Sequence, residues 1–131
     1  MLSAFFAALT AIFAKIGIKG VDTDLATAIR TVVILILAWG IAFFRGGTAT
    51  LHTLSRQNLP FLCLSGVATG LSWIFYFKAL QLGKVSQVAP VDKMSVAIAI
   101  ILSVVFLGEP LTWKTAIGAL FIIGGTLILI L

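Results

Sequence analysis

Residues 89–108 read APVDKMSVAIAIILSVVFLG, and from Val96 to Gly108 this segment is apolar apart from one serine. A membrane-spanning helix needs roughly 20 mainly apolar residues, so the segment has the composition of a span. Its start nevertheless carries Pro90, Asp92 and Lys93 where lipid is expected. Charged side chains are costly in lipid and usually face a bundle interior or an aqueous cavity. The segment therefore predicts a helix of a membrane bundle whose charged end is not exposed to lipid.

The composition of the whole chain indicates a membrane protein. Of its 131 residues 61% are hydrophobic and only 10% are charged, and the mean hydropathy is +1.22. Soluble domains carry far more charge. The apolar runs are continuous rather than alternating, and they are about twice as long as a tilted barrel strand. We therefore predict an all-α integral membrane protein that crosses the membrane several times.

Polar and helix-breaking stretches divide the chain into five spans. The separators are KGVDTD, RGGTATLHTLSRQN, the pair GK and the triplet GEP. The expected spans of this single transmembrane domain, residues 1–131, cover about 2–18, 25–44, 59–82, 86–107 and 111–131. The first run lacks the basic start and the cleavage site of a signal peptide, so we interpret it as a helix.

The sequence lacks the patterns of an enzyme. Its single cysteine, Cys63, lies in the third span, and its single histidine, His52, lies in a loop. Neither a disulfide nor a Cys/His metal cluster is expected. We predict no catalytic residue, no cofactor and no metal site. The net charge of +5 comes from scattered basic residues, which suit anchoring to membrane lipid better than binding nucleic acid.

Five charged residues are expected to form one layer. Asp92 lies about 9 Å, and Arg30 about 8 Å, from the start of its span, and both spans start on the same side. Lys15 and Lys78 stand near the ends of spans that finish on that side, and Lys93 follows Asp92. The other half of every span is free of charge. We call these five residues the charged layer.

Each member of the charged layer has a structural alternative. Lys15 and Lys78 can extend their stems toward the lipid headgroups. Arg30 and Asp92 can form a structural ion pair or line a cavity. Adjacent positions on a helix point about 100° apart, so we expect Lys93 and Asp92 to face different neighbours.

The third span carries two further signals. Gly66 and Gly70 form a small-xxx-small pair, which serves close packing within the chain or between chains. Trp73 and Tyr76 belong to the cluster WIFYF and suit either an interfacial belt or a binding cavity.

The second half of the chain resembles a known family. The stretch YFKALQLGKVSQVAPV and the tail FLGEPLTWKTAIGALFIIGGTLILIL are similar to the end of an EamA repeat of the drug/metabolite transporter superfamily. The resemblance covers nearly the whole chain. The last span is also similar to the dimerisation helix of small multidrug resistance proteins through Gly118, Phe121, Ile122, Gly125 and Thr126, although Phe121 and Thr126 depart from its consensus.

The resemblance implies a transporter in a prokaryotic inner or cell membrane. By this resemblance, most EamA transporters are expected to hold two inverted five-span repeats. This chain resembles the bacterial and archaeal branch, whose members hold one such repeat. We expect a homodimer, and two copies inserted oppositely, as an antiparallel homodimer, would restore the inverted arrangement. The interface is expected at Gly118, Phe121, Ile122 and Gly125. The intramembrane carboxylate of small multidrug resistance proteins has no counterpart in the first two spans.

The predicted function is transport of a small metabolite by alternating access. Four cations against Asp92 give the charged layer a net charge of +3, which favours anionic or zwitterionic cargo. The expected substrate or gate residues are Arg30, Trp73, Tyr76, Asp92 and Lys93, with Asp92 also a candidate acceptor of a coupling proton. The alternatives are a non-transporting membrane assembly subunit and one half of a heteromeric transporter.

Basic residues are balanced between the two faces of the predicted topology. Arg45, Arg56 and Lys114 lie on the side of the N-terminus, whereas Lys19 and Lys84, with Lys15 and Lys78 near their helix ends, lie on the other. Orientation follows an excess of Lys and Arg on the cytoplasmic side, so balance permits insertion in both senses.

This balance predicts dual topology. Single cysteines placed at Gly47 and at Asp22 should each react with a membrane-impermeant thiol reagent from both sides of the membrane. Labelling of each position from one side only would contradict dual insertion.

Overall fold

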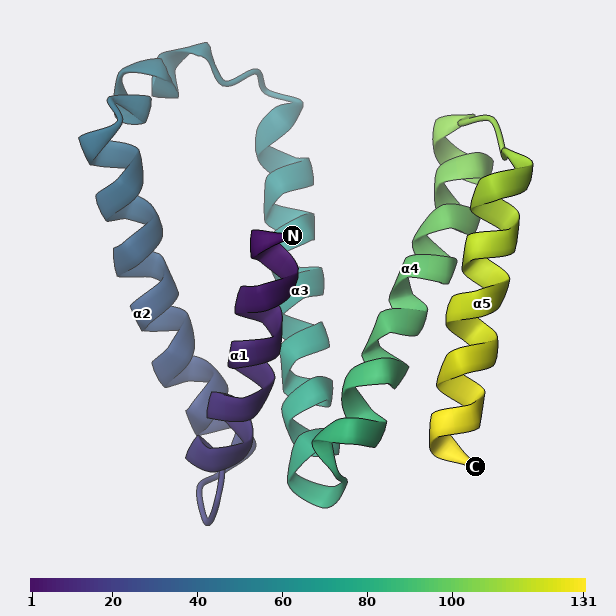
Figure 1. The fold of residues 1–131 in the computed structure, drawn as a ribbon. Coiled ribbons are helices and arrows are strands. Elements are labelled where there is room, and N and C mark those ends of the chain that lie inside the picture. Colours follow the sequence, from purple (N-terminus) through teal and green to yellow (C-terminus); the bar gives the residue numbers. More distant parts are fainter. The chain divides into compact units, whose positions relative to one another are not determined.

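The computed structural model describes all residues, 1–131, and all its regular secondary structure is helical. Its α-helices in chain order are α1 (Leu2–Gly17), α2 (Thr23–Phe44), α3 (Asn58–Leu82), α4 (Val85–Leu107) and α5 (Trp113–Ile130) (Figure 1). A short 3-10 helix, η1 (Gly47–Thr53), lies between α2 and α3. The expected all-α class is confirmed.

Four helices have the length and apolar composition of membrane spans, namely α2, α3, α4 and α5. Helix α1 is also apolar, but it has 16 residues. At 1.5 Å per residue it extends about 24 Å, which is less than the roughly 30 Å hydrocarbon core of a bilayer. A crossing by α1 therefore requires local thinning of the bilayer or help from its flanking residues.

Side-chain caps and glycines set the helix ends. Oδ1 of Asp22 accepts hydrogen bonds of 3.0 Å from the backbone N–H groups of Asp24 and Leu25, so α2 begins at Thr23. Gly108 ends α4 with φ of +66°, which glycine adopts without strain. The hydroxyl of Thr112 accepts from the N–H of Thr115, and α5 therefore begins two residues after the start of the expected fifth span.

The chain divides into two compact units. The α2–α3 unit covers Phe13–Gln81, and the α4–α5 unit covers Met1–Ile12 with Leu82–Leu131. That the chain forms one transmembrane domain stays a prediction.

The α2–α3 unit is closed at one end by a small core and three polar contacts. Ile18, Thr23, Phe77 and Leu80 are buried. Nε2 of Gln81 donates to the carbonyls of Val21 (3.0 Å) and Ile18 (3.4 Å), and Nζ of Lys15 donates to the carbonyl of Leu80. These bonds fasten the end of α3 to the connection between α1 and α2. The Lys15 ammonium is thus bound within the unit instead of extending to the headgroups.

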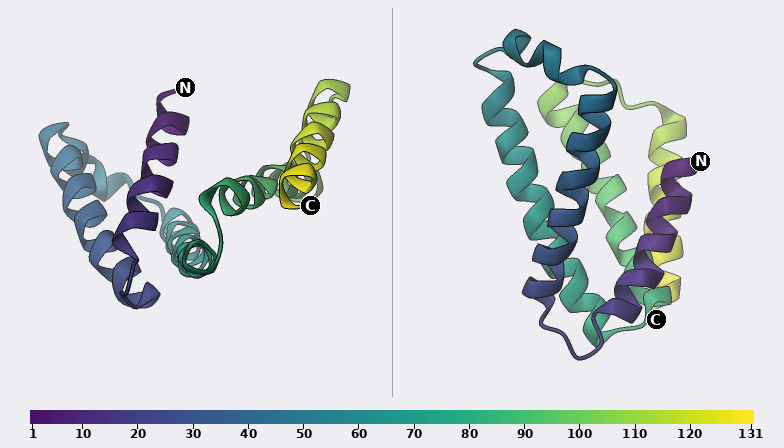
Figure 2. Two further views of the ribbon diagram at one scale, coloured as in Figure 1. Left: turned by 60° about the horizontal axis from the view of Figure 1, so that its bottom comes forward. Right: turned by 90° about the vertical axis from the view of Figure 1, so that its left-hand side faces the viewer.

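In the α4–α5 unit the two helices lie side by side as an antiparallel pair (Figures 1 and 2). Ala97 and Thr126 are buried between them. Oγ1 of Thr126 donates to the carbonyl of Pro90 at 3.2 Å. Pro90 lies inside α4 and has no N–H, which weakens the helix at this point. The bond from Thr126 therefore ties α5 to the weakest turn of α4.

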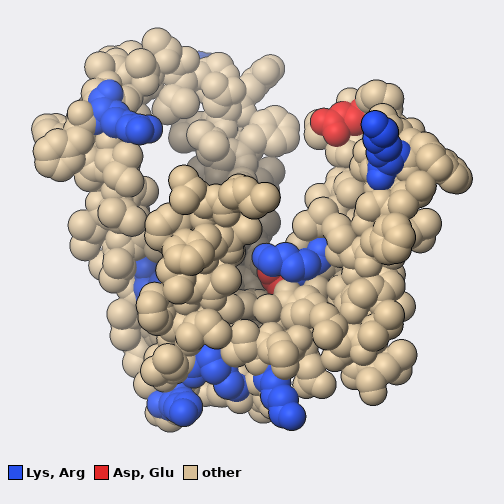
Figure 3. All heavy atoms as spheres, viewed as in Figure 1, with Lys and Arg blue, Asp and Glu red and all other residues tan.

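Most of the surface is apolar and uncharged. Figure 3 shows the flanks of the helices largely without Lys, Arg, Asp or Glu. Large side chains such as Phe44, Phe106 and Ile128 are at least three-quarters exposed. Such surfaces suit contact with lipid, where no apolar side chain needs to be hidden from water.

Thr126→Val should destabilise the protein. The change keeps the side-chain volume but removes the bond to Pro90, at a cost of about 1 kcal/mol in the free energy of unfolding. Denaturant unfolding in detergent measures this cost. The control is Thr31→Val, because the exposed Thr31 hydroxyl bonds only the Thr27 carbonyl of its own helix. Equal losses in both variants would contradict the role assigned to Thr126.

Candidate functional site

A groove of about 380 Å³ lies between α2 and α3 within the α2–α3 unit. The two helices converge toward the N-terminal end of α2 and diverge toward η1, as Figure 1 and the right-hand view of Figure 2 show. Helix α2 contributes Thr27, Arg30, Thr31 and Ile34 to the walls, and α3 contributes Leu62, Ser65, Gly66, Thr69, Gly70, Trp73 and Phe77.

Arg30 is the charged residue of this groove. Its guanidinium carbon lies 3.5 Å from the centroid of the Trp73 ring and 5.3 Å from that of Phe77. Trp73 and Phe77 stand four residues apart and therefore share one face of α3. A cation–π contact of this kind contributes about 0.5–2 kcal/mol. Attraction to the indole thus holds the guanidinium against the wall of the groove.

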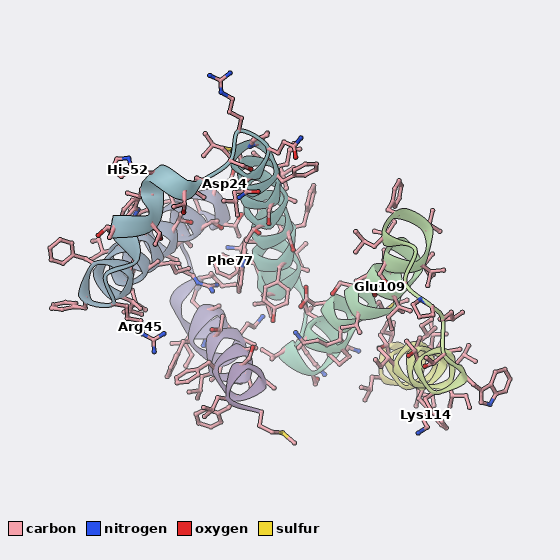
Figure 4. All side chains as sticks on the ribbon, turned by 90° about the horizontal axis from the view of Figure 1, so that it is seen from above. Asp24, Arg45, His52, Phe77, Glu109 and Lys114 are labelled. Atoms are coloured by element: carbon pink, nitrogen blue, oxygen red, sulfur yellow. The ribbon has the colours of Figure 1, made fainter.

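The aromatic side chains around Arg30 support one another. Trp73 packs edge-on against Phe77, with ring centroids 5.5 Å apart, and against Tyr76 at 5.7 Å. Phe77, labelled in Figure 4, is only 2% exposed. The rings are therefore held in place before any ligand arrives, and they keep water away from one face of the guanidinium.

No carboxylate lines the groove. The acidic residues of the α2–α3 unit are Asp22 and Asp24, at the start of α2, and Asp22 already caps that helix. Nη1 of Arg30 is buried and makes no hydrogen bond. A buried polar group without a partner is costly, and more so when it is charged. Arg30 therefore gives the groove a positive charge that no lining side chain neutralises.

The threonine hydroxyls of the groove already use their protons. Thr27 donates to the carbonyl of Thr23 and Thr31 to that of Thr27, each at 2.8 Å. Thr69 donates to the carbonyl of Ser65, also at 2.8 Å. Their oxygens can still accept a hydrogen bond. The three threonine hydroxyls are thus not free to donate to an anion, which leaves Arg30 and the hydroxyl of Ser65 among the charged and hydroxyl side chains of the lining.

The structure brings together three of the five predicted substrate or gate residues. Arg30 and Trp73 line the groove, and Tyr76 packs beside Trp73. The ring of Trp73 lies against the Arg30 guanidinium in the wall of the groove, which favours a cavity over an interfacial belt for this residue. Participation of all three in transport stays a prediction.

Asp92 and Lys93 lie on α4 and contact each other. Nζ of Lys93 is 3.3 Å from Oδ2 of Asp92, and the side chains are 58% and 36% exposed, respectively. The expectation that these neighbours face different partners was wrong, because the flexible lysine stem reaches back along the helix. Within its own unit Arg30 thus contacts an aromatic ring, and Asp92 forms an ion pair with Lys93.

The predicted interface residues lie on α5. A Cβ atom added at Gly118 or Gly125 would meet nothing within 4 Å. Packing against α4 therefore does not require glycine at either position. Phe121 is 76% exposed, and Ile122 is half-buried. Lys114 at the start of α5 extends away from α4 (Figure 4). Their role in a dimer stays a prediction.

Several lining residues were not singled out from the sequence. Thr27 and Ile34 stand three and four positions from Arg30 and share its face of α2, and the neighbouring Thr31 lines the edge of the groove. Gly66 and Gly70 were interpreted as a packing motif, yet a Cβ at either would meet nothing within 4 Å, and both line the groove. Helical spacing from Arg30 and from Trp73 would have found most of these residues.

Comparison with known proteins gives matches over most of the chain. Residues 1–131 match the model of the EamA-like transporter family. A protein of Sinorhizobium sp described as an uncharacterized transporter in the cobO 3' region is 46% identical over 129 residues, or 98% of this chain and 92% of that protein. An uncharacterized protein of Methanocaldococcus jannaschii is 35% identical over 74 residues, or 56% of this chain and 54% of that protein. No solved structure matches.

Proposed function

Since the chain belongs to the EamA-like transporter family and is a multi-pass membrane transporter, we propose that it moves a small anionic or zwitterionic metabolite by alternating access as a dimer. Family membership points to transport rather than to an enzyme. The relatives in a bacterium and an archaeon support a place in a prokaryotic inner or cell membrane.

The observation that carries the choice of cargo is the uncompensated charge of Arg30. Its guanidinium lines the groove on an aromatic ring, Nη1 lacks an acceptor, and no carboxylate is among the lining residues. An anionic group entering the groove would meet an attractive field in a poorly hydrated place, where electrostatic interactions are strong. A cation would be repelled.

A dimer supplies the second half of the transport path. If all five helices cross the membrane, the termini lie on opposite sides, and an inverted second copy restores the two-repeat arrangement. The open glycine positions of α5, Gly118 and Gly125, support a partner helix there. The remaining apolar flanks face membrane lipid.

The ion pair of α4 is proposed as part of the gate. Asp92 and Lys93 stand next to Pro90, where the helix lacks a backbone hydrogen bond and bends most easily. Opening this pair would free the Asp92 carboxylate to take up a coupling proton.

Proteoliposomes test the transport function. They should exchange at least one labelled member of a panel of amino acids, monocarboxylates and phosphate monoesters, and they should not exchange tetraphenylphosphonium. Arg30→Gln and Asp92→Asn should each lower exchange more than tenfold while expression and elution volume stay normal. Exchange of the cation alone would contradict the proposed cargo.

Two results would favour the alternatives. Absence of exchange with the whole panel, together with stable co-purification of another membrane protein, indicates an assembly subunit. Exchange that appears only when a second related five-span chain is added indicates one half of a heteromeric transporter.

Dimerisation has its own test. Gly118→Leu and Gly125→Leu should each reduce the dimer fraction in lipid bilayers several-fold, because the larger side chain prevents close helix approach. Gly40→Leu on α2 is the matched control, since a Cβ there also meets nothing within 4 Å. Equal dimer fractions in all three variants would rule out α5 as the interface.

A further inference from the structure

We infer that the α2–α3 groove of a single chain is a binding site for a small monocarboxylate with an apolar body. The carboxylate pairs with Arg30, and the body lies over the glycine face of α3. This inference rests on the proposed function in one respect only, namely that the bound molecule is taken to be the transported cargo.

The number of charges favours a monoanion. Arg30 provides one positive charge, and the remaining lining is apolar or consists of hydroxyl groups and glycines. A phosphate monoester carries up to two negative charges near neutral pH, and the second would remain uncompensated in a place with little water. A carboxylate carries one charge and is matched by the single guanidinium.

The orientation of the guanidinium favours a planar anion. One face is covered by the Trp73 ring, 3.5 Å away, and Nη1 is enclosed without an acceptor. A ligand in the groove therefore reaches Arg30 along its open edge. The N–H groups of a guanidinium lie in its plane and match the two oxygens of a carboxylate, which a lysine ammonium does not.

The floor of the groove provides room for the apolar body. Gly66 and Gly70 line the groove, and a Cβ at either would meet nothing within 4 Å. Gly66 stands two turns and Gly70 one turn before Trp73 on the same face of α3, within about 10 Å along its axis. Ile34 and Leu62 add apolar walls. A flat hydrocarbon group attached to the carboxylate fits this surface.

A helix of a second copy explains the groove less well than a small ligand. Glycines could admit a partner helix. An apolar helix packed there would, however, bury the Arg30 charge without an acceptor, and such an uncompensated charge is strongly destabilising. A carboxylate ligand supplies the acceptor.

Fluorescence of Trp73 gives a direct test of binding. Trp39→Phe with Trp113→Phe leaves Trp73 as the only indole, and its emission responds to changes of charge beside the ring. In lipid nanodiscs, 3-phenylpropanoate should produce a saturable change. The neutral 3-phenylpropanamide and the dianionic 2-phenylethyl phosphate should each bind at least tenfold more weakly. Thermal unfolding of the unaltered chain should show the same ranking, because a ligand stabilises the state that it binds.

Paired variants locate the site. Arg30→Gln and Arg30→Lys should each weaken 3-phenylpropanoate binding at least tenfold, whereas Arg45→Gln should leave it unchanged within twofold. Arg45 ends the same helix but extends outward, away from the groove (Figure 4). Gly66→Leu should block binding, since its side chain enters the groove without a clash, and Gly40→Leu should not.

The results separate this inference from the proposed function. Equal binding of the amide, or unchanged binding in Arg30→Gln, overturns the inference even if proteoliposomes show transport. A Trp73 signal that depends on dimer formation and not on 3-phenylpropanoate also overturns it, because a second copy then fills the groove. If the chain binds the carboxylate selectively but proteoliposomes show no exchange, the binding site is supported and the transport proposal is contradicted.

Discussion

The contact between Arg30 and Trp73 is the constraint on which the candidate site depends. It places a permanent cation about 10 Å along α2 from Thr23, among helices built mainly of apolar residues. A charge in such surroundings needs a partner, and the indole is a weak one compared with a carboxylate. The missing acceptor at Nη1 belongs to this residue, and the open glycines Gly66 and Gly70 line the same groove. The site is attractive to an anion because the fold leaves the cation incompletely satisfied.

The bilayer explains why so few polar contacts organise this fold. Lipid offers no water to bond with backbone groups, so each helix satisfies its own backbone and exposes apolar side chains. The hydrophobic effect contributes little between helices in lipid. Side-chain bonds to backbone carbonyls then become important, as from Gln81 to Val21 in one unit and from Thr126 to Pro90 in the other. Both bonds fasten helix segments where the chain turns or bends.

Membership in the EamA-like family and the chemistry of the groove answer different questions. The family match covers residues 1–131 and establishes a transporter. Transporters that share one fold can nevertheless carry many different cargoes. The groove offers a cargo one guanidinium, threonine hydroxyls whose protons are used, and a glycine face with room above it. The gate role proposed for the Asp92–Lys93 pair next to Pro90 concerns a separate step, namely movement between states.

The sequence by itself determined the class and the elements of this protein. Continuous apolar runs require helices in a membrane, and Asp22, Gly108 and Thr112 define helix ends through local bonds and backbone angles. Only the tertiary structure decided the partners of the charges. Periodicity tells which side chains share a face of a helix, but not which helix lies opposite, because that depends on packing between residues far apart in the chain. Arg30 therefore contacts Trp73, and within the chain Gly66 and Gly70 line a groove.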